Sequence, residues 1–326
     1  MAEPLLDIRG LQTHFNTFGG LVKAVDGVSF DVKAGEIVGL VGESGGGKSV
    51  IGYSILGLID APGKIVGGEI RFDGRDIAKL NESEMRTVRG REIAMVFQDP
   101  MTSLNPVYTV GRQMDEVLRL HTDLDPAARR ARCIRILEDV GISEADKRLD
   151  AYPHQFSGGM RQRVVIAIAL LAGSRLIIAD EPTTALDVTV QSQILKLMRR
   201  QVEDTGAAMI LVTHDLAVVS EMADRVVVLY CGKVVECGQT DEIIANPAHP
   251  YTRGLLDSIP RIADRQHRLR QIPGTVPDIR SIGVGCSFRA RCFRAQPICA
   301  ERSPSLAHIR GSLNAACHFP LEEAVR

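Results

Sequence analysis

Short stretches in which hydrophobic and polar residues alternate open the chain and predict a small antiparallel sheet. They cover residues 5–9, 28–33 and 69–72, with turn residues between them. A nearly continuous apolar run over 36–42 lies between the second and third stretches, as expected of a strand buried on both faces. A glycine-rich loop follows that strand directly.

The pattern becomes helical between about residues 82 and 173, and we interpret this part as a helical insert. Asp125-Pro126 is a typical N-cap and first-turn pair, and Gly141 is a typical helix end. Strands and helices then alternate, which predicts the α/β fold class with parallel strands and crossover connections. The expected elements are strands at 176–179 and 209–213, a helix at 188–204, and a hairpin of 226–230 with 234–237.

Residues 262–326 differ from the rest of the chain in texture and in charge. This part is loop-rich with little periodicity, so it cannot form a large core of its own and needs docking or a metal centre. It holds ten Lys or Arg and five Asp or Glu, whereas residues 1–261 hold 29 and 35. We therefore predict a main domain over 1–261 and a C-terminal extension over 262–326.

Composition excludes several classes of protein. Of 326 residues 45% are hydrophobic, which is enough for a sizeable core and rules out a disordered chain. The net charge of −1 provides no overall attraction to nucleic acid. The longest apolar run, residues 164–172, is far too short to span a bilayer, and Glu3 and Asp7 do not suit a secretory signal. We expect a cytosolic protein whose cysteines are reduced thiols, metal ligands or cluster ligands, and not disulfides.

The glycine-rich loop has the pattern of a phosphate-binding loop in its required context, between a buried strand and an expected helix over 49–58. Its glycines let backbone N–H groups turn inward around the β- and γ-phosphates of a nucleotide. Lys48 supplies a positive charge, and the Ser49 hydroxyl can ligate Mg²⁺. The loop comprises Gly42, Glu43, Ser44, Gly45, Gly46, Gly47, Lys48 and Ser49.

Two adjacent acids follow the expected strand at 176–179, where ligands of open α/β sheets bind. Asp180 is the candidate Mg²⁺ partner, and Glu181 is the candidate general base or water-orienting carboxylate. An ordinary helix N-cap is the alternative interpretation of such a pair. Together with the phosphate loop, the acids predict an enzyme that hydrolyses nucleoside triphosphates.

Further motifs, in a fixed order, resemble those of the ATP-binding cassette (ABC) family. The segment 156–160, Phe-Ser-Gly-Gly-Met, is similar to the family signature, although Met160 stands where glutamine is usual. Gln98 follows an expected strand at 93–97 and resembles the Q-loop glutamine; Asp187 and His214 resemble the D-loop aspartate and the switch histidine. The resemblance covers about residues 4–255 and implies an ATPase with a RecA-like phosphate-loop core, an antiparallel β-subdomain and an α-helical subdomain at about 99–173.

The resemblance also implies roles for single residues. Two cassettes would pair head to tail, with each ATP held between the phosphate loop of one chain and the signature of the other. On the ATP bound by the same chain, the resemblance implies that Glu181, His214 and Gln98 are catalytic. It implies that Ser49, Gln98 and Asp180 contact Mg²⁺. The residues that would contact the ATP bound by the partner cassette are Ser157, Gly158, Gly159, Met160 and Asp187.

The adenine ring of ATP stacks on an aromatic side chain ahead of the phosphate loop in cassettes of this kind. Phe18 fits best, with Phe15 and Phe30 as rivals. Phe30 alternates with Val28 and Val32, which favours a core position. The signature ending in Met160 looks like one branch of the peptide-importer cassettes, which favours a heterodimer and leaves a homodimer open.

The C-terminal extension resembles that of dipeptide and oligopeptide (Dpp/Opp-type) ABC importers, on His249-Pro250-Tyr251-Thr252 and Ile272-Pro273-Gly274. Zinc sites usually have tight Cys-x₂₋₄-Cys hooks, whereas wider gaps beside arginines suit an iron–sulfur cluster. Members of that family carry a four-iron four-sulfur (4Fe–4S) cluster at such cysteines, so we expect a cluster, with zinc or unligated thiols as alternatives. The candidate ligands are Cys286, Cys292, Cys299 and Cys317.

The resemblance implies an ATP-hydrolysing subunit that powers import of di- or oligopeptides through separate permease subunits. Its expected partners are a second cassette, two membrane permeases and an extracytoplasmic peptide-binding protein, at the cytoplasmic face of the bacterial inner or plasma membrane. Gln98 and the helical insert after it, about residues 99–155, would contact the permeases. The rival class, soluble ABC ATPases that act on nucleic acid or ribosomes, is disfavoured by the single phosphate loop and the short distance to the signature.

Overall fold

The computed structural model describes residues 3–184, 186–259 and 271–322, and the chain falls into two compact units. The first unit contains the phosphate loop and the C-terminal region, in residues up to 32, 37–79 and from 212 onward. The second contains residues 33–36 and 80–211. The boundary therefore passes through strand β8 (Ala208–Thr213).

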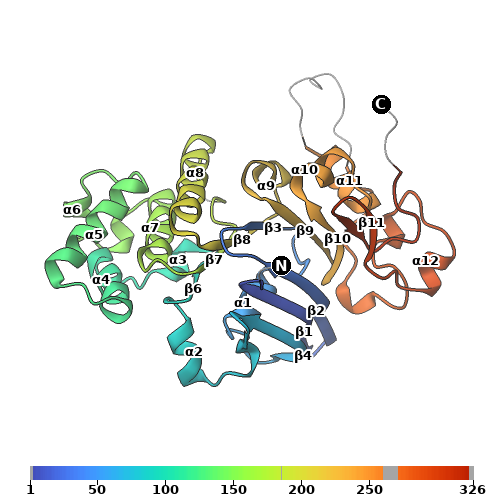
Figure 1. Ribbon diagram of the computed structural model, residues 1–326, viewed down its shortest axis with the longest axis horizontal. Helices are drawn as coiled ribbons and strands as arrows, with labels where there is room; N and C mark the ends of the chain where they lie inside the picture. Colours follow the sequence, from blue (N-terminus) through green and yellow to red (C-terminus); the bar gives the residue numbers. More distant parts are fainter. Residues whose placement is uncertain (1–2, 185, 260–270, 323–326) are drawn as a thin grey trace. The chain divides into compact units, whose positions relative to one another are not determined.

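An antiparallel sheet of order β2-β1-β4-β5 begins the first unit (Figure 1). Leu6, Ile8 and Leu11 of β1 are fully buried, so the alternating pattern does mark the core face. β1 and β2 are longer than expected because bulges, as between Ile8 and Leu11, interrupt the alternation in the sequence. The strands are β1 (Leu6–Thr17), β2 (Gly20–Val32), β4 (Gly63–Phe72) and β5 (Arg75–Asp76), with the 3-10 helix η1 (Ile77–Lys79) after them.

The strand that leads into the phosphate loop is β3 (Ile37–Val41), and all five of its residues are buried. It pairs in parallel with β9 (Arg225–Tyr230), which forms the expected hairpin with β10 (Lys233–Gln239). Both residues of the hairpin turn, Cys231 and Gly232, have positive φ, as a tight two-residue turn requires. Helix α1 (Lys48–Ile55) starts inside the loop.

The C-terminal region extends the same row of strands, in the order β11-β12-β10-β9-β3. β12 pairs with β10 through Glu236↔Ala315 and Cys237↔Asn314. This region is thus docked by backbone hydrogen bonds, which its low periodicity did not reveal. Its elements are η4 (Ile279–Ser281), η5 (Arg289–Arg291), α12 (Ile298–Glu301), β11 (Ala307–Arg310) and β12 (Leu313–Ala315). The helices of the first unit between β8 and this region are α9 (Leu216–Met222), α10 (Thr240–Ala245) and α11 (Pro250–Asp257).

The second unit is mainly helical, as predicted, and its helices start at polar caps. Asp125 caps α5 by accepting from the Ala128 N–H at 2.8 Å, with Pro126 in the first turn. Asn81 and Glu84 form a capping box at α2. The helices are α2 (Glu82–Val88), α3 (Pro100–Ser103), α4 (Val110–His121), α5 (Pro126–Asp139), α6 (Ala145–Arg148), the 3-10 helix η2 (Pro153–Gln155), α7 (Gly158–Leu171) and α8 (Val188–Thr205).

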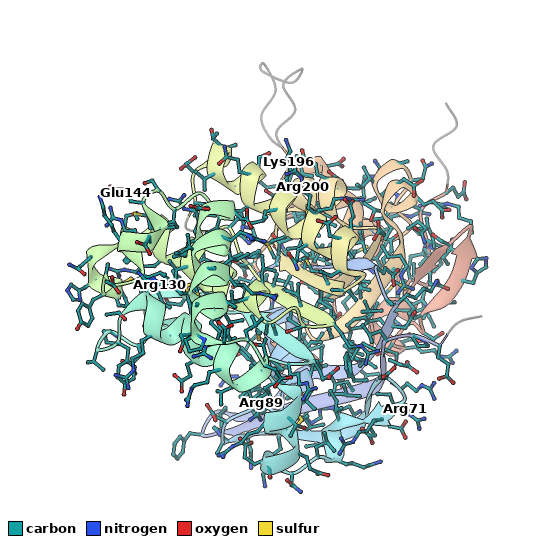
Figure 2. All side chains as sticks on the ribbon, turned by 60° about the vertical axis from the view of Figure 1, so that its left-hand side comes forward. Arg71, Arg89, Arg130, Glu144, Lys196 and Arg200 are labelled. Carbon is teal, nitrogen blue, oxygen red and sulfur yellow. The ribbon has the colours of Figure 1, made fainter. Side chains whose placement is uncertain are left out.

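Helix α7 forms the core of this unit. It is apolar on most of its surface and contacts α3, α4, α5 and β6 (Ile93–Val96). β6 pairs in parallel with β7 (Leu176–Asp180), and both strands are buried throughout. The outer surface is charged: Arg130 on α5 and the pair Lys196 and Arg200 on α8 point outward (Figure 2). None of the helices in the described ranges combines the length and hydrophobicity needed to cross a membrane.

Candidate nucleotide site

The phosphate loop turns tightly between β3 and α1. Gly47 has φ +94°, and a Cβ there would lie 2.2 Å from the Ala24 carbonyl oxygen, so only glycine fits. The Gly46 N–H donates to the Glu43 carbonyl at 3.1 Å, which closes the turn. Lys48 is buried and donates from Nζ to the carbonyls of Gly42 at 2.7 Å and Glu43 at 3.0 Å. The ammonium therefore lies over the loop, where a phosphate group would bind.

Glu181 is held at the end of β7 by two side chains. Gln98 Nε2 donates to Glu181 Oε2 at 3.2 Å, and Thr184 Oγ1 donates to the same oxygen at 3.2 Å. Asp180, the preceding residue, is fully buried. The structure thus brings together Gln98 and Glu181, two residues that the motifs had singled out, and adds Thr184, which no motif indicated.

The signature segment forms the N-terminus of α7. The Ser157 side chain accepts from the Met160 N–H at 3.3 Å and so caps the helix, while Ser157 and Gly158 remain exposed. Further along α7, Gln162 is buried and donates to the Pro182 carbonyl at 2.8 Å. This bond fastens the signature helix to the turn after Glu181, a link that the sequence did not indicate.

Asp187 and His214 also lie beside helix starts. Asp187 caps α8 by accepting from the Val190 N–H at 3.0 Å. His214 is exposed between β8 and α9, next to Asp215, which caps α9. His214 and Lys48 belong to the first compact unit, whereas Gln98, Asp180 and Glu181 belong to the second.

The three aromatic candidates for the adenine ring differ in exposure. Phe18 is fully exposed in the turn between β1 and β2, and Phe15 is half-buried. Phe30 is only 9% exposed, which agrees with the core position expected from its alternation. Phe18 is therefore the candidate whose ring is free to stack on a ligand.

The four C-terminal cysteines line one small pocket, together with His249, His318 and the aromatic rings of Phe288 and Phe319. Burial raises the pKa of Cys317 to about 11, and the three other thiols raise it further. Burial also raises the pKa of Cys286 and of Cys292. Among the described residues, no three His, Cys, Asp or Glu side chains are arranged to hold a metal ion. The structure thus gathers four thiols around one pocket and shows no arranged metal site among the residues it describes.

The fold and the motifs define an ATP-binding cassette, and two family models match the chain. Residues 25–184 match the ABC transporter family, and residues 235–299 match the oligopeptide/dipeptide transporter C-terminal region. A solved dimeric cassette in a post-hydrolysis state with ADP and phosphate is 28% identical, with a TM-score of 0.66 over 72% of this chain and 98% of that one. These matches confirm the predicted fold class, the ATPase activity and ATP as the nucleotide.

Curated relatives match almost from end to end. The dipeptide transport ATP-binding protein DppD of Escherichia coli is 46% identical over 99% of this chain and 98% of its own. A probable peptide ABC transporter ATP-binding protein of Sinorhizobium fredii is 49% identical over 97% and 95%. The oligopeptide transport ATP-binding protein AppD of Bacillus subtilis is 46% identical over 98% of both. The chain belongs to the ATP-binding subunits of dipeptide and oligopeptide ABC transporters.

Proposed function

We propose that this chain hydrolyses ATP to power import of di- or oligopeptides through separate permease subunits. The observation that carries the proposal is the near full-length similarity to transport proteins for dipeptides and oligopeptides, which includes their characteristic C-terminal region. ATP binding would draw two cassettes together, and hydrolysis would release them. The second cassette would be a different chain or a copy of this one.

The site residues have defined roles in this proposal. The loop residues 42–49 would bind the phosphates, with Lys48 as the positive charge, and Phe18 would stack on adenine. Mg²⁺, when bound, supplies charge neutralisation on the phosphates and would be held by Ser49, Gln98 and Asp180. Glu181, oriented by Gln98 and Thr184, would take a proton from the attacking water, and His214 would contact the γ-phosphate.

Other residues of this chain would contact the partner cassette's ATP or the membrane subunits. Ser157, Gly158, Gly159, Met160 and Asp187 would face the ATP on the partner cassette. Two permeases would contact the helical part at 99–155, and an extracytoplasmic peptide-binding protein would deliver the solute. The chain would act at the cytoplasmic face of the bacterial inner or plasma membrane. The ATPase domain would comprise residues 1–261, and the C-terminal extension would comprise residues 262–326.

We also propose that Cys286, Cys292, Cys299 and Cys317 ligate a 4Fe–4S cluster, with zinc as the alternative. Their shared pocket supports this proposal, as does the presence of Arg289 and Arg294 in its lining, since cations offset the negative charge of a thiolate-ligated cluster. The cluster would stabilise a region that has few apolar residues of its own.

A peptide-uptake assay tests the proposed function. In a strain lacking the gene, the wild-type chain should restore uptake of a labelled dipeptide. Glu181→Gln should reduce the restored rate by about 10²-fold or more, because the amide cannot accept a proton from water. Glu138→Gln, an exposed carboxylate on α5, is the matched control and should restore uptake fully. Normal uptake without the gene, or full activity of Glu181→Gln, would disprove the assignment.

A further inference from the structure

Arg291 connects the cysteine-rich region to the phosphate loop within one compact unit. It ends helix η5 and lies between Cys286 and Cys292 in sequence, and it is only 7% exposed. Its Nη1 donates to Glu43 Oε2 at 2.6 Å, and its Nη2 donates to Glu43 Oε1 at 3.0 Å. A buried guanidinium thus forms a two-point ion pair with a carboxylate of the loop.

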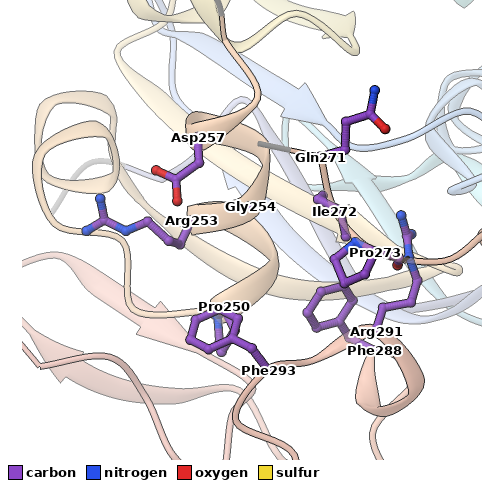
Figure 3. A pocket seen from close by; sticks show the side chains of 10 residues that line it. All are labelled: Pro250, Arg253, Gly254, Asp257, Gln271, Ile272, Pro273, Phe288, Arg291 and Phe293. Atoms are coloured by element: carbon purple, nitrogen blue, oxygen red, sulfur yellow. Dashed lines mark hydrogen bonds between the residues drawn. The ribbon is translucent and has the colours of Figure 1, made fainter. Parts of the chain in front are cut away.

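Further hydrogen bonds hold the guanidinium in this orientation. Arg291 Nε donates to the Pro273 carbonyl at 2.9 Å, and Nη1 also donates to the Tyr230 hydroxyl at 3.3 Å. Figure 3 shows Arg291 beside Pro273 and Phe288. Burial raises the pKa of Tyr230 to about 12, so its hydroxyl stays protonated at neutral pH. Arg291 therefore has little freedom to move away from Glu43.

The backbone of Glu43 is held by a residue of α11, which precedes the cysteine-rich region in the chain. The Glu43 N–H donates to the hydroxyl of Tyr251, a fully buried residue of α11, at 2.8 Å. The ring of Tyr230 packs edge-on against Tyr251 and Phe288, with centroids 4.7 and 5.2 Å apart. The second residue of the loop is thus fixed at its backbone and its side chain by residues 208 and 248 positions later.

A displacement of Glu43 would reach the groups that bind phosphate. The Glu43 carbonyl accepts from Lys48 Nζ at 3.0 Å and from the Gly46 N–H at 3.1 Å. The position of Glu43 therefore sets where the lysine ammonium lies and how the loop amides turn. The ion pair between Arg291 and the Glu43 side chain therefore influences both the Lys48 ammonium and the loop amides.

A second residue of the C-terminal region contacts the turn that carries Phe18. Arg280 Nη1 donates to the Gly19 carbonyl at 3.3 Å, and Asp278 holds the guanidinium through contacts of 3.0 and 2.9 Å to Nε. The same region therefore touches both segments of this unit that are expected to hold the nucleotide.

We infer that Arg291 is a positioning residue for nucleotide binding, through which the C-terminal cysteine region holds the phosphate loop in its binding shape. The inference rests on the proposed role of the loop. Without Arg291 the loop spends less time in that shape, and the apparent Kd rises as the competent fraction falls. The rate at saturating ATP should change little, because Arg291 touches no reacting atom.

Titration of the full-length chain with a fluorescent ATP analogue and Mg²⁺ tests this inference. Arg291→Gln should raise the Kd about tenfold, within the usual range for coupled sites. Arg291→Lys keeps the charge but loses the two-point contact, so its Kd should lie between those of Arg291→Gln and wild type. Arg302→Ala removes an exposed arginine of the same region and should leave the Kd unchanged.

A double-mutant cycle shows whether Arg291 acts through Glu43. Glu43→Gln should raise the Kd to a similar extent, and the double variant should bind no more weakly than either single variant. Kd values unchanged in Arg291→Gln and Arg291→Lys, even with lower melting temperatures, would overturn the inference. Additive effects in the cycle would also overturn it. If Arg291→Gln does not fold, Arg291→Lys and Glu43→Gln decide the question. A wild-type chain that fails to bind the analogue would instead refute the proposed function.

Discussion

Glu181 illustrates how a single residue is placed for chemistry at the end of a strand. It has φ +46°, a left-handed conformation that is uncommon for a residue with a side chain. Such a conformation costs of order 1 kcal/mol and persists only where neighbouring contacts fix it. Here Gln98 and Thr184 both bond to the carboxylate. These two hydrogen bonds fix the carboxylate of a residue whose backbone is already in an uncommon conformation.

His249 makes a pH-dependent contribution to stability that can be predicted in sign. It is 1% exposed, and its Nδ1 accepts from the Tyr251 N–H at 3.1 Å; burial lowers its pKa to about 4. Between the ordinary pKa of 6.5 and pH 4 the unfolded chain binds the proton and the folded chain does not, so stability falls as pH falls. We expect a loss of about 2 kcal/mol between pH 7 and pH 5.

Urea unfolding at both pH values measures this contribution. His249→Asn keeps an N-cap acceptor but does not titrate, so its free energy of unfolding should lack this part of the pH dependence. An equal loss of stability in wild type and His249→Asn would show that the proton binds elsewhere.

At the scale of elements, helix starts place the exposed groups of the cassette. Ser157 begins α7, Asp187 begins α8 and Asp215 begins α9, each through a side-chain acceptor for a backbone N–H. A helix start presents unsatisfied N–H groups and a positive end of the helix dipole, which favour an anion. The start of α7, whose cap is an uncharged serine, therefore suits the trans contact with phosphate that we propose for Ser157.

Ser157→Asp separates the capping role of Ser157 from its proposed role in trans. Aspartate caps a helix as well as serine does, so α7 and the melting temperature should be preserved. Its negative charge would repel the γ-phosphate on the partner cassette, and ATP hydrolysis by the assembled transporter should fall about tenfold or more. The Kd of the chain's own phosphate loop, measured by nucleotide titration, should not change. Ser157→Thr is the control, and unimpaired hydrolysis by Ser157→Asp would exclude the trans contact.

At the scale of the whole molecule, the basic C-terminal region is built into the first unit. β12 pairs with β10, and Arg291 pairs with Glu43 of the phosphate loop. The sequence predicted that this region needs docking or a metal centre; strand pairing supplies the docking. A group bound by the four cysteines would add a further link among their segments.

Removal of cysteines tests that group. Protein purified without oxygen should be brown, with absorbance near ~400 nm and bound iron and sulfide. Cys292→Ser and Cys299→Ser should each lose the colour and lower the melting temperature. Cys237→Ser, at a half-buried cysteine of β10 outside the pocket, should keep both. A colourless wild type that contains zinc would favour the alternative, and one without metal would leave the thiols unligated.

Short-range chemistry explains what could be predicted from the sequence. The phosphate loop, the acids after β7 and the Asp125-Pro126 cap each depend on residues within about a turn of one another, so their spacing alone defines them. Gln98 was predicted from its motif order. The longer extent of β1 and β2 was missed because bulges interrupt the alternation of side chains.

The sequence by itself determined which segments form helices or strands, the nucleotide-binding loop and the class of enzyme, because each depends on the spacing of residues that are close in the sequence. Only the tertiary structure decided which distant groups meet, such as Arg291 with Glu43, Thr184 with Glu181, and β12 with β10. The sequence around a single arginine or a short polar strand is the same whether that residue or strand faces solvent or packs against a distant part of the chain. Burial and hydrogen bonding across the fold determine which of these occurs.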